Sequence, residues 1–465
     1  MDPVMISRRR LLQLGGAGLL NLSLPGTVAA RVDAMGGPGG GAADKSCIFI
    51  LLCGGPSHID TWDLKPSAPA EIRGPYKPIA TKVPGMRISE LHTRLADLTQ
   101  HICLIRSMSH AGPISNHFDA MHNLLSGVAD APVDAPYIGS VLARLRPSQH
   151  SVASYIWLIK CIGDPVFCAP NIATGGYLGT PYAPLFVGTA ENNPSTPNFK
   201  PPDDLFTAAD VPPERLQGRS QLLESLNASA GDGRAALEQW QNVQRHAFDL
   251  AVSSDARRAF NVELEDPKLR DRYGRHPLGQ NLLLARRLVE SGVGFVTVNG
   301  WTGKAPDEKL GGPPASSWDM HGSNMGMGSA FGTGSYGMGW CLPRLDEALS
   351  ALLADLQDRG LLERTLVVCM GEFGRTPNII NGQFPGRQHW PQCWSAILAG
   401  GGVRGGQLYG ESDKTGSSVK DRPVRPQDLS ATIYHALGVP LDPRLGKDGV
   451  SQPLTKGTPL VELFG

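Results

Sequence analysis

Histidines and carboxylates gather in short segments of this sequence, and these residue types bind divalent cations in proteins. The candidate metal ligands, in chain order, are His58, Asp60, Asp319, His321, Glu372 and His389. A combination of imidazole and carboxylate oxygen suits zinc, manganese and similar ions. In both the first pair and the Asp319/His321 pair the residues are two positions apart, so their side chains can point the same way from an extended segment. The pattern predicts one or two divalent ions: zinc, manganese or calcium.

A second set of residues could act on a substrate beside such ions. Ser115 or Asn116 is expected to cap a short helix, and a helix N-terminus attracts anions and suits a nucleophile. Ser115 and His117 are therefore candidate catalytic residues. Arg375 and Arg387 are candidates for binding an oxyanion through bidentate hydrogen bonds. Paired metal ions and an oxyanion-binding arginine are typical of enzymes that hydrolyse phosphate or sulfate esters.

Each of these residues also has a structural interpretation. A single histidine in a short segment is more often structural than catalytic. Asp60 could cap the turn after Gly-Pro, and Glu372 could cap a helix or pair with Arg375. The chemical interpretation therefore depends on the fold bringing the segments together.

The strands and helices that would bring these segments together are recognisable in the sequence as apolar runs that alternate with helical patterns. Buried strands are predicted at 47–53, 102–105, 156–159, 293–298, 365–370 and 395–399. Helices are predicted at 280–291, 342–359 and 427–437. This alternation favours an α/β fold with a largely parallel sheet. Ligands bind outside the carboxyl ends of strands in such sheets, and the polar segments lie there or in adjoining loops.

The composition sets limits on function and organisation. The 465 residues carry 43 Lys+Arg and 43 Asp+Glu, so the net charge of zero gives no reason to expect nucleic-acid binding. The 41% hydrophobic residues suffice for a large core. We expect one domain over 46–465 with a helical insertion near 213–265. The Gly/Met-rich segment 322–339 lacks periodicity and is predicted to be a long loop, functional or mobile.

The N-terminus has the layout of an export signal. Ser7-Arg8-Arg9-Arg10 is a twin-arginine pattern, a mild apolar stretch follows it, and small residues near Ala30 suit cleavage. That stretch and every later one are shorter than the roughly 20 residues that cross a bilayer. We predict a signal peptide at 1–30, a linker at 31–45, no membrane span, and a periplasmic or extracellular location.

The cysteines do not suggest a zinc site of their own. There are eight and no Cys-x-x-Cys pair. Cys47, Cys53 and Cys369 lie in apolar runs and are interpreted as buried thiols. Cys161 and Cys168 flank a short loop, which makes them the best candidate disulfide in an exported chain.

The chain also resembles a bacterial family, domain of unknown function 1501, over about residues 46–440. The motifs that carry the resemblance are GGPSHIDTWDLKP, VPGMRISEL, GQNLLLARRLVESGVGFVTVN, WDMHGSN, VVCMGEFGRTP, GRQHWP, LAGGGVRGG and DLSATIYHALG. That family is similar to the alkaline phosphatase and sulfatase superfamily. The resemblance implies a three-layer α/β/α sandwich around a mostly parallel sheet, with an alkaline phosphatase-like core.

The resemblance also assigns expected roles to single residues. The superfamily's first-strand aspartate would fall at Asp60, with His58 a local addition, and its final metal-binding histidine at His389. Asp319 and His321 resemble its Asp-and-His metal segment. Its strand-end Asp-His pair falls at Glu372 and Phe373, which implies that one of its two metal sites is incomplete here.

The position of the superfamily nucleophile is different in this chain. In sulfatases a Cys or Ser opens the helix that ends in Thr-Gly, and counting back from Ser126-Gly127 places His117 there, with Ser115 close by. The sulfatase motif Cys-x-Pro-Ser-Arg does not occur, so a formylglycine sulfatase is disfavoured.

Two classes of function follow from these observations. The first is an exported metal-dependent hydrolase acting on a small anionic ester or on a sulfated or phosphorylated glycan. The second is a non-catalytic relative that binds an anionic glycan or a partner in the cell envelope, with a purely structural envelope protein as its limiting case.

Overall fold

The computed structural model describes residues 45–150, 152–159, 175–201, 253–306, 317–322, 327–447 and 450–465, with isolated positions between 215 and 225. The chain divides into two compact units. The larger comprises Gly39–Pro201, Ser253–Leu445 and Gln452–Gly465, and all the candidate site residues belong to it. The smaller comprises Met1–Pro38, Pro202–Val252 and Gly446–Ser451. The predicted signal peptide, nearly all of the linker and most of the predicted helical insertion lie outside the described residues.

An eight-stranded sheet forms the centre of the larger unit, in the order β12-β4-β11-β8-β1-β7-β5-β6. Its strands are β1 (Ser46–Leu51), β4 (Ile102–Met108), β5 (Tyr155–Leu158), β6 (Leu185–Val187), β7 (Phe295–Asn299), β8 (Thr365–Met370), β11 (Trp394–Ala399) and β12 (Gln407–Tyr409). β11 runs antiparallel to both its neighbours, and every other neighbouring pair is parallel. The predicted mostly parallel sheet is confirmed.

Burial on both faces explains why these strands are continuous apolar runs. In β1 the side chains of Cys47, Phe49 and Leu51 point to one face, and those of Ile48 and Ile50 point to the other. All five are at most 2% exposed. A strand with helices on both sides has no solvent-facing positions for polar residues.

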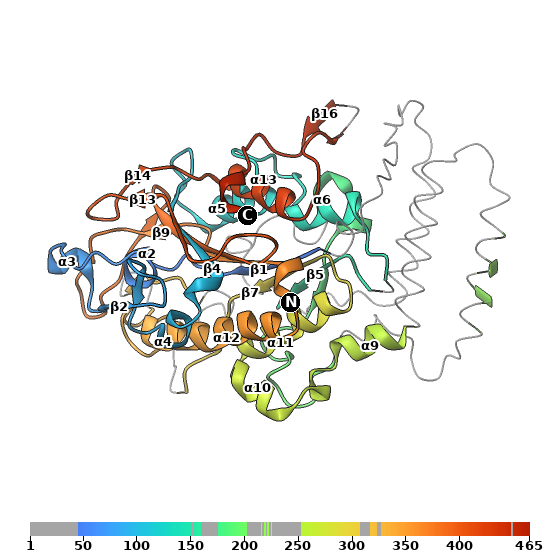
Figure 1. Ribbon diagram of the computed structural model, residues 1–465, viewed down its shortest axis with the longest axis horizontal. Helices are drawn as coiled ribbons and strands as arrows, with labels where there is room; N and C mark the ends of the chain where they lie inside the picture. Colours follow the sequence, from blue (N-terminus) through green and yellow to red (C-terminus); the bar gives the residue numbers. More distant parts are fainter. Residues whose placement is uncertain are drawn as a thin grey trace. The chain divides into compact units, whose positions relative to one another are not determined.

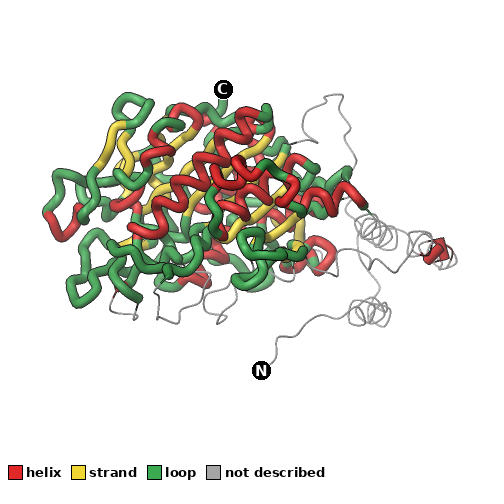
Figure 2. The backbone as a smooth tube through the Cα atoms, turned by 90° about the horizontal axis from the view of Figure 1, so that it is seen from below, coloured by secondary structure: helices red, strands yellow, loops and turns green. Residues whose placement is uncertain are grey.

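Helices cover both faces of the sheet, which gives a three-layer α/β/α arrangement (Figure 1). One layer holds α5 (His117–Ser126), α6 (Ile138–Leu145) and α13 (Pro426–Ala436), and these share a core cluster with the sheet. The other holds α11 (Pro277–Glu290) and α12 (Met338–Asp358). Figure 2 shows helices lying across the strands from this second side.

Shorter elements complete the described chain. The remaining α-helices are α2 (His58–Thr61), α3 (Ala70–Arg73), α4 (Thr93–Ala96), α9 (Ser254–Phe260) and α10 (Pro267–Tyr273). Four two-stranded sheets pair β2 (Pro78–Ala80) with β3 (Arg87–Ser89), β9 (Gly374–Arg375) with β10 (His389–Trp390), β13 (Glu411–Ser412) with β14 (Val419–Asp421), and β15 (Arg444–Lys447) with β16 (Val450–Pro453).

Several smaller predictions can be compared with the structure. Cys47, Cys53 and Cys369 are buried free thiols, as predicted. The proposed Cys161–Cys168 pair lies outside the described residues. In the Gly/Met-rich segment, the backbone N–H of Ala330 donates to Pro385 O at 2.9 Å, so this part is tied to its surroundings. Among the described residues no helix combines the length and apolar character needed to cross a membrane.

Candidate metal centre

The topology brings the polar segments to one edge of the central sheet. β1, β7 and β8 are mutually parallel, and β4 shares their direction because both β4 and β8 run antiparallel to β11. Their carboxyl ends therefore open at the same edge. β4 leads to α5 and His117, β7 leads to the segment with Asp319 and His321, and β8 leads to Glu372. These side chains therefore lie at the carboxyl ends of the strands, where ligands bind in such sheets.

α5 presents His117 to this edge as its first residue. The side-chain oxygen of the N-cap Asn116 accepts a hydrogen bond from the N–H of Asp119 at 2.9 Å. Gly127 ends the helix with a positive φ of 66°. The predicted capped helix is therefore present, with Asn116 rather than Ser115 as its cap.

A short antiparallel ribbon presents His389. In this ribbon β10 pairs with β9, with His389 opposite Arg375 and Trp390 opposite Gly374. The indole N–H of Trp390 also donates to Ser417 O at 2.7 Å. The ribbon thereby fixes His389 relative to the segment that follows β8.

Four side chains converge into one group of potential metal ligands: His117, Asp319, His321 and His389. One ligand atom from each lies within 4.8 Å of all the others. The Nε2 atoms of His321 and His389 are 2.8 Å apart, and His321 Nε2 lies 3.0 Å from Asp319 Oδ1. His117 Nε2 lies 3.3 Å from Asp319 Oδ2. Ligand atoms around a tetrahedral zinc ion stand about 3.3 Å apart, given metal–ligand distances of about 2.0 Å.

The other ring nitrogen of each histidine faces an acceptor. His389 Nδ1 lies 2.7 Å from the carbonyl oxygen of Ser115, His321 Nδ1 lies 2.8 Å from Gln388 Oε1, and His117 Nδ1 lies 2.6 Å from Glu372 Oε1. A carbonyl oxygen only accepts, so the His389 ring donates from Nδ1. With Nδ1 donating in all three rings, each Nε2 faces the centre of the group, where a bound cation would take the place of any Nε2 proton.

The charges around the group favour a cation. Burial raises the pKa of Asp319, but Arg375, whose Nη2 is 2.6 Å from Asp319 Oδ1, and the three neighbouring histidines hold that pKa well below its usual range. Burial lowers the pKa of His117, but its hydrogen bonds to Asp319 and Glu372 outweigh burial and raise it to about 9. Burial also lowers the pKa of His389. Two carboxylates thus stabilise positive charge at the position of the His117 ring.

Both candidate oxyanion-binding arginines are fully buried and hold protein groups. Arg387 pairs with Asp60, its Nε 2.7 Å from Oδ2, and also donates to Ile72 O at 2.7 Å. Arg375 donates to Gly55 O at 2.8 Å and to Arg387 O at 3.1 Å, besides its pair with Asp319. Asp60 is therefore the partner of Arg387 and does not belong to the four-residue group.

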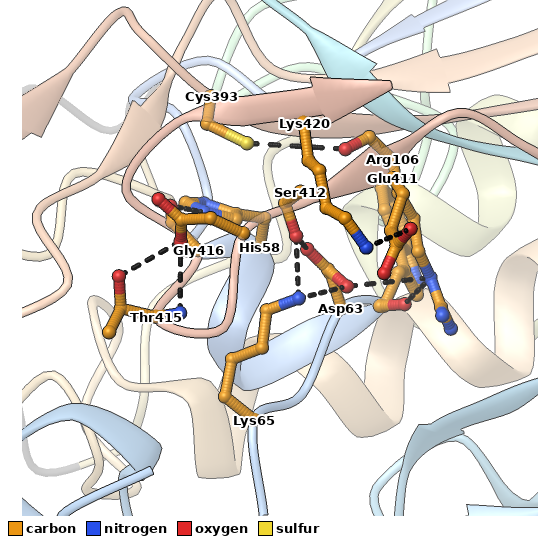
Figure 3. Close-up of polar contacts among 12 residues, drawn as sticks. His58, Asp63, Lys65, Arg106, Cys393, Glu411, Ser412, Thr415, Gly416 and Lys420 are labelled. Atoms are coloured by element: carbon orange, nitrogen blue, oxygen red, sulfur yellow. Dashed lines mark hydrogen bonds and ion pairs between the residues drawn. The ribbon is translucent and has the colours of Figure 1, made fainter. Parts of the chain in front are cut away.

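His58 likewise lies outside the four-residue group. Its Nε2 is 2.7 Å from Gly416 O, in the loop between β13 and β14. Figure 3 shows this contact beside a second cluster, in which Lys65 Nζ lies 2.9 Å from Asp63 Oδ1 and 2.5 Å from Ser412 Oγ. Burial lowers the pKa of His58, which suits a neutral ring that donates to a carbonyl. His58 thus ties the β13–β14 loop to α2.

Three residues around the group were not predicted as site residues. Gln388 contacts His321, and its place next to His389 in the GRQHWP motif was the available signal. His110 Nε2 donates to Glu372 O at 2.7 Å, and burial lowers the pKa of His110 to about 4. Gly54 has a φ of 114°, and a Cβ there would stand 2.3 Å from Asp319 N. Its place at the end of the first apolar run signalled a close backbone approach.

The chain has a clear match among protein families and distant matches among solved structures. The model of the family described as Protein of unknown function (DUF1501) matches residues 44–464. None of the curated proteins matches the sequence.

Three of the similar solved structures show how low the similarity in sequence and fold is. Ps i-CgsB in complex with k-i-k-neocarrahexaose is 11% identical, with a TM-score of 0.38 and coverage of 89% of this chain and 74% of that one. Phosphonate monoester hydrolase SpPMH from Silicibacter pomeroyi is 11% identical, with a TM-score of 0.37 and coverage of 90% and 76%. The PsFucS1 sulfatase from Pseudoalteromonas sp. is 12% identical, with a TM-score of 0.34 and coverage of 85% and 68%. Function must therefore be argued from the site.

Proposed function

We propose that this chain, which belongs to the family described as Protein of unknown function (DUF1501), is a metal-dependent hydrolase of phosphate or sulfate esters. The observation that carries the proposal is the convergence of His117, Asp319, His321 and His389, with one ligand atom from each within 4.8 Å of the others. Buried polar atoms need partners, and three imidazole nitrogens that face one carboxylate suit a bound cation.

The donor set supports one transition-metal ion. Three imidazoles and a carboxylate suit zinc or manganese, whereas calcium takes six to eight oxygen ligands. Two-metal sites hold their ions about 3.5–4 Å apart, and a second ion needs further ligands beyond these four. When bound, a divalent ion would polarise the ester oxygen and neutralise the charge that develops as the ester is cleaved.

The chain's own residues would fix the site and orient the substrate. Arg375 holds Asp319 in place through the 2.6 Å contact between Nη2 and Oδ1. The N-terminus of α5, a helix of ten residues, would favour an anionic group beside His117. Ser115, two residues before the helix, is the candidate attacking hydroxyl. Attack by Ser115 Oγ would transfer the phosphoryl or sulfuryl group to that oxygen and release the alcohol, which takes up the hydroxyl proton. Water would then cleave the seryl ester, restore the Ser115 hydroxyl and release phosphate or sulfate.

Turnover of model esters tests this function. Chelator-treated protein resupplied with Zn²⁺ or Mn²⁺ should cleave at least one of an aryl phosphate monoester, an aryl phosphate diester and an aryl sulfate. Asp319→Asn should abolish that turnover. Ser115→Ala keeps the carbonyl that binds His389, so it should retain the metal and lose turnover only if the hydroxyl attacks. Metal-loaded protein inert toward every ester class would contradict the proposal.

A second candidate is a non-catalytic protein that binds an anionic glycan or an envelope partner. Two observations favour it: the guanidinium groups of Arg375 and Arg387 are held by protein acceptors, and α5 opens with a histidine that contacts two carboxylates. Binding of a sulfated oligosaccharide without cleavage, weakened by Asp319→Asn, would support this candidate over the hydrolase.

We further propose that the chain is exported by the twin-arginine route and acts outside the cytoplasm. The pattern Ser7-Arg8-Arg9-Arg10 supports this proposal. Replacing Arg8 and Arg9 by lysine keeps the charge and removes the recognised pair, so the precursor should stay in the cytoplasm. Unchanged export of that variant would contradict the route.

A further inference from the structure

Glu372 occupies a position that sets it apart from the four converging side chains. It follows β8 and is fully buried. Its Oε1 accepts a hydrogen bond from Gly54 N at 2.9 Å and lies 2.6 Å from His117 Nδ1. Glu372 is not one of the four residues whose ligand atoms lie within 4.8 Å of one another.

This contact determines how the His117 ring is used. An ionised carboxylate only accepts, so His117 must donate from Nδ1, and its Nε2 is directed to the inside of the group, 3.3 Å from Asp319 Oδ2. Gly54 N fixes the carboxylate in turn. The ring is thereby held in one orientation with one nitrogen presented.

The same arrangement occurs at the other two histidines, with different acceptors. His389 Nδ1 faces the Ser115 carbonyl and His321 Nδ1 faces the Gln388 side chain. Of the three acceptors only Glu372 is a carboxylate. A carboxylate that accepts the Nδ1–H bond makes the opposite ring nitrogen a stronger metal ligand. The effect on metal affinity should therefore be largest at His117.

We infer that Glu372 is a positioning residue, which orients His117 and strengthens its Nε2 as a ligand for a divalent transition-metal ion without binding that ion itself. The inference rests on the proposed metal site and assigns Glu372 a role different from the ligand role expected from sequence. Its other oxygen, Oε2, is buried without a hydrogen-bond partner and is the atom that a ligand role would use.

Zinc affinity separates the two roles. Glu372→Gln keeps an oxygen that can accept from Gly54 N and His117 Nδ1, whereas Glu372→Leu removes both bonds. We expect Glu372→Gln to weaken zinc binding about 10-fold and Glu372→Leu up to about 100-fold, since loss of such outer partners costs that much. His321→Ala, which removes a ligand, should cost more than either. Asp346→Asn is the matched control, because Asp346 is a buried carboxylate that accepts a hydrogen bond from Leu95 N in α4. This variant should leave zinc affinity unchanged.

The ring proton gives a readout independent of metal binding. In ¹H–¹⁵N spectra of histidine-labelled protein, His117 Nδ1–H should resonate far downfield and exchange slowly, with or without zinc. The signal should persist in weakened form in Glu372→Gln and vanish in Glu372→Leu. Unchanged zinc affinity and an unchanged signal in Glu372→Leu would overturn the inference, and so would a zinc loss in Glu372→Gln as large as in His321→Ala. Wild-type protein that binds neither zinc nor manganese would refute the proposed function, whereas the proton signal would still test the positioning role.

Discussion

At the scale of single residues, the candidate centre depends on how closely two segments approach. Gly54, three residues after the end of β1, lies against the backbone of Trp318 and Asp319, and Asp319 supplies the carboxylate of the group. The same glycine donates its N–H to Glu372. One residue thus sets the distance between the strand end and two acidic side chains, and its missing Cβ is what permits the contact.

Gly54→Ala should therefore damage the site as well as the fold. A Cβ there would stand 2.3 Å from Asp319 N, so the 318–319 segment must move. Gly85→Ala is the matched control, because Gly85 also has a positive φ, 83°, but no atom lies within 4 Å of its Cβ position. We expect Gly85→Ala to cost about 1–2 kcal/mol in the free energy of unfolding with zinc affinity unchanged. Gly54→Ala should cost more and weaken zinc binding, as urea unfolding and zinc titration would show. Equal effects of the two variants would contradict this account.

The ligand pattern was only partly predictable from residue types. Asp319 and His321 lie in one short segment, and their spacing alone indicated a shared role. His58 and Asp60 have the same spacing, yet their side chains contact Gly416 and Arg387. These partners are more than 300 positions away in the sequence, so no local pattern could reveal them. Arg387 neutralises Asp60 in a buried pair, which a count of carboxylates and histidines does not show.

At the scale of elements, α5 connects the sheet to the candidate centre. Its first residue is a member of the group, and its cap is Asn116, whose side chain accepts from Asp119 N. The helix was predictable because the cap residue and the terminal Gly127 are local signals. The β9–β10 ribbon was not predictable, since each strand has only two residues and the pairing joins segments 14 positions apart.

Asn116→Ala should loosen the start of α5 and with it His117. Loss of an N-cap costs about 1 kcal/mol of stability. Ser253→Ala removes the equivalent cap of α9, where Ser253 Oγ accepts from Ala256 N at 3.0 Å. Both variants should lower the free energy of unfolding by similar amounts in urea titrations, and only Asn116→Ala should weaken zinc binding. Zinc affinity equal in both variants would show that the cap does not position His117.

At the scale of the whole molecule, the sheet order explains why distant motifs meet. The apolar runs predicted each long strand because both faces of the sheet are covered, and continuous hydrophobic strands are the result. The antiparallel insertion of β11 between β4 and β8 could not be inferred, because an apolar run carries no information on direction. The four ligands come from segments that follow β4, β7 and β9, so a bound ion would link parts of the chain far apart in sequence.

Metal binding should therefore stabilise the folded molecule. An ion that binds only the folded state adds about 2.7 kcal/mol when its concentration is 100 times the Kd. We expect zinc to raise the thermal unfolding midpoint of chelator-treated protein, measured by calorimetry. Asp319→Asn should show no such rise. A rise of the same size in Asp319→Asn would place the stabilising ion elsewhere.

The central claim is that His117, Asp319, His321 and His389 hold one ion, and metal content tests it most directly. Plasma mass spectrometry of the purified protein should find about one zinc or manganese ion per chain. His389→Ala should lose it, and His150→Ala, which replaces an exposed histidine outside the group, should retain it. Wild-type protein without a bound ion, or an ion retained in full by His389→Ala, would contradict the account.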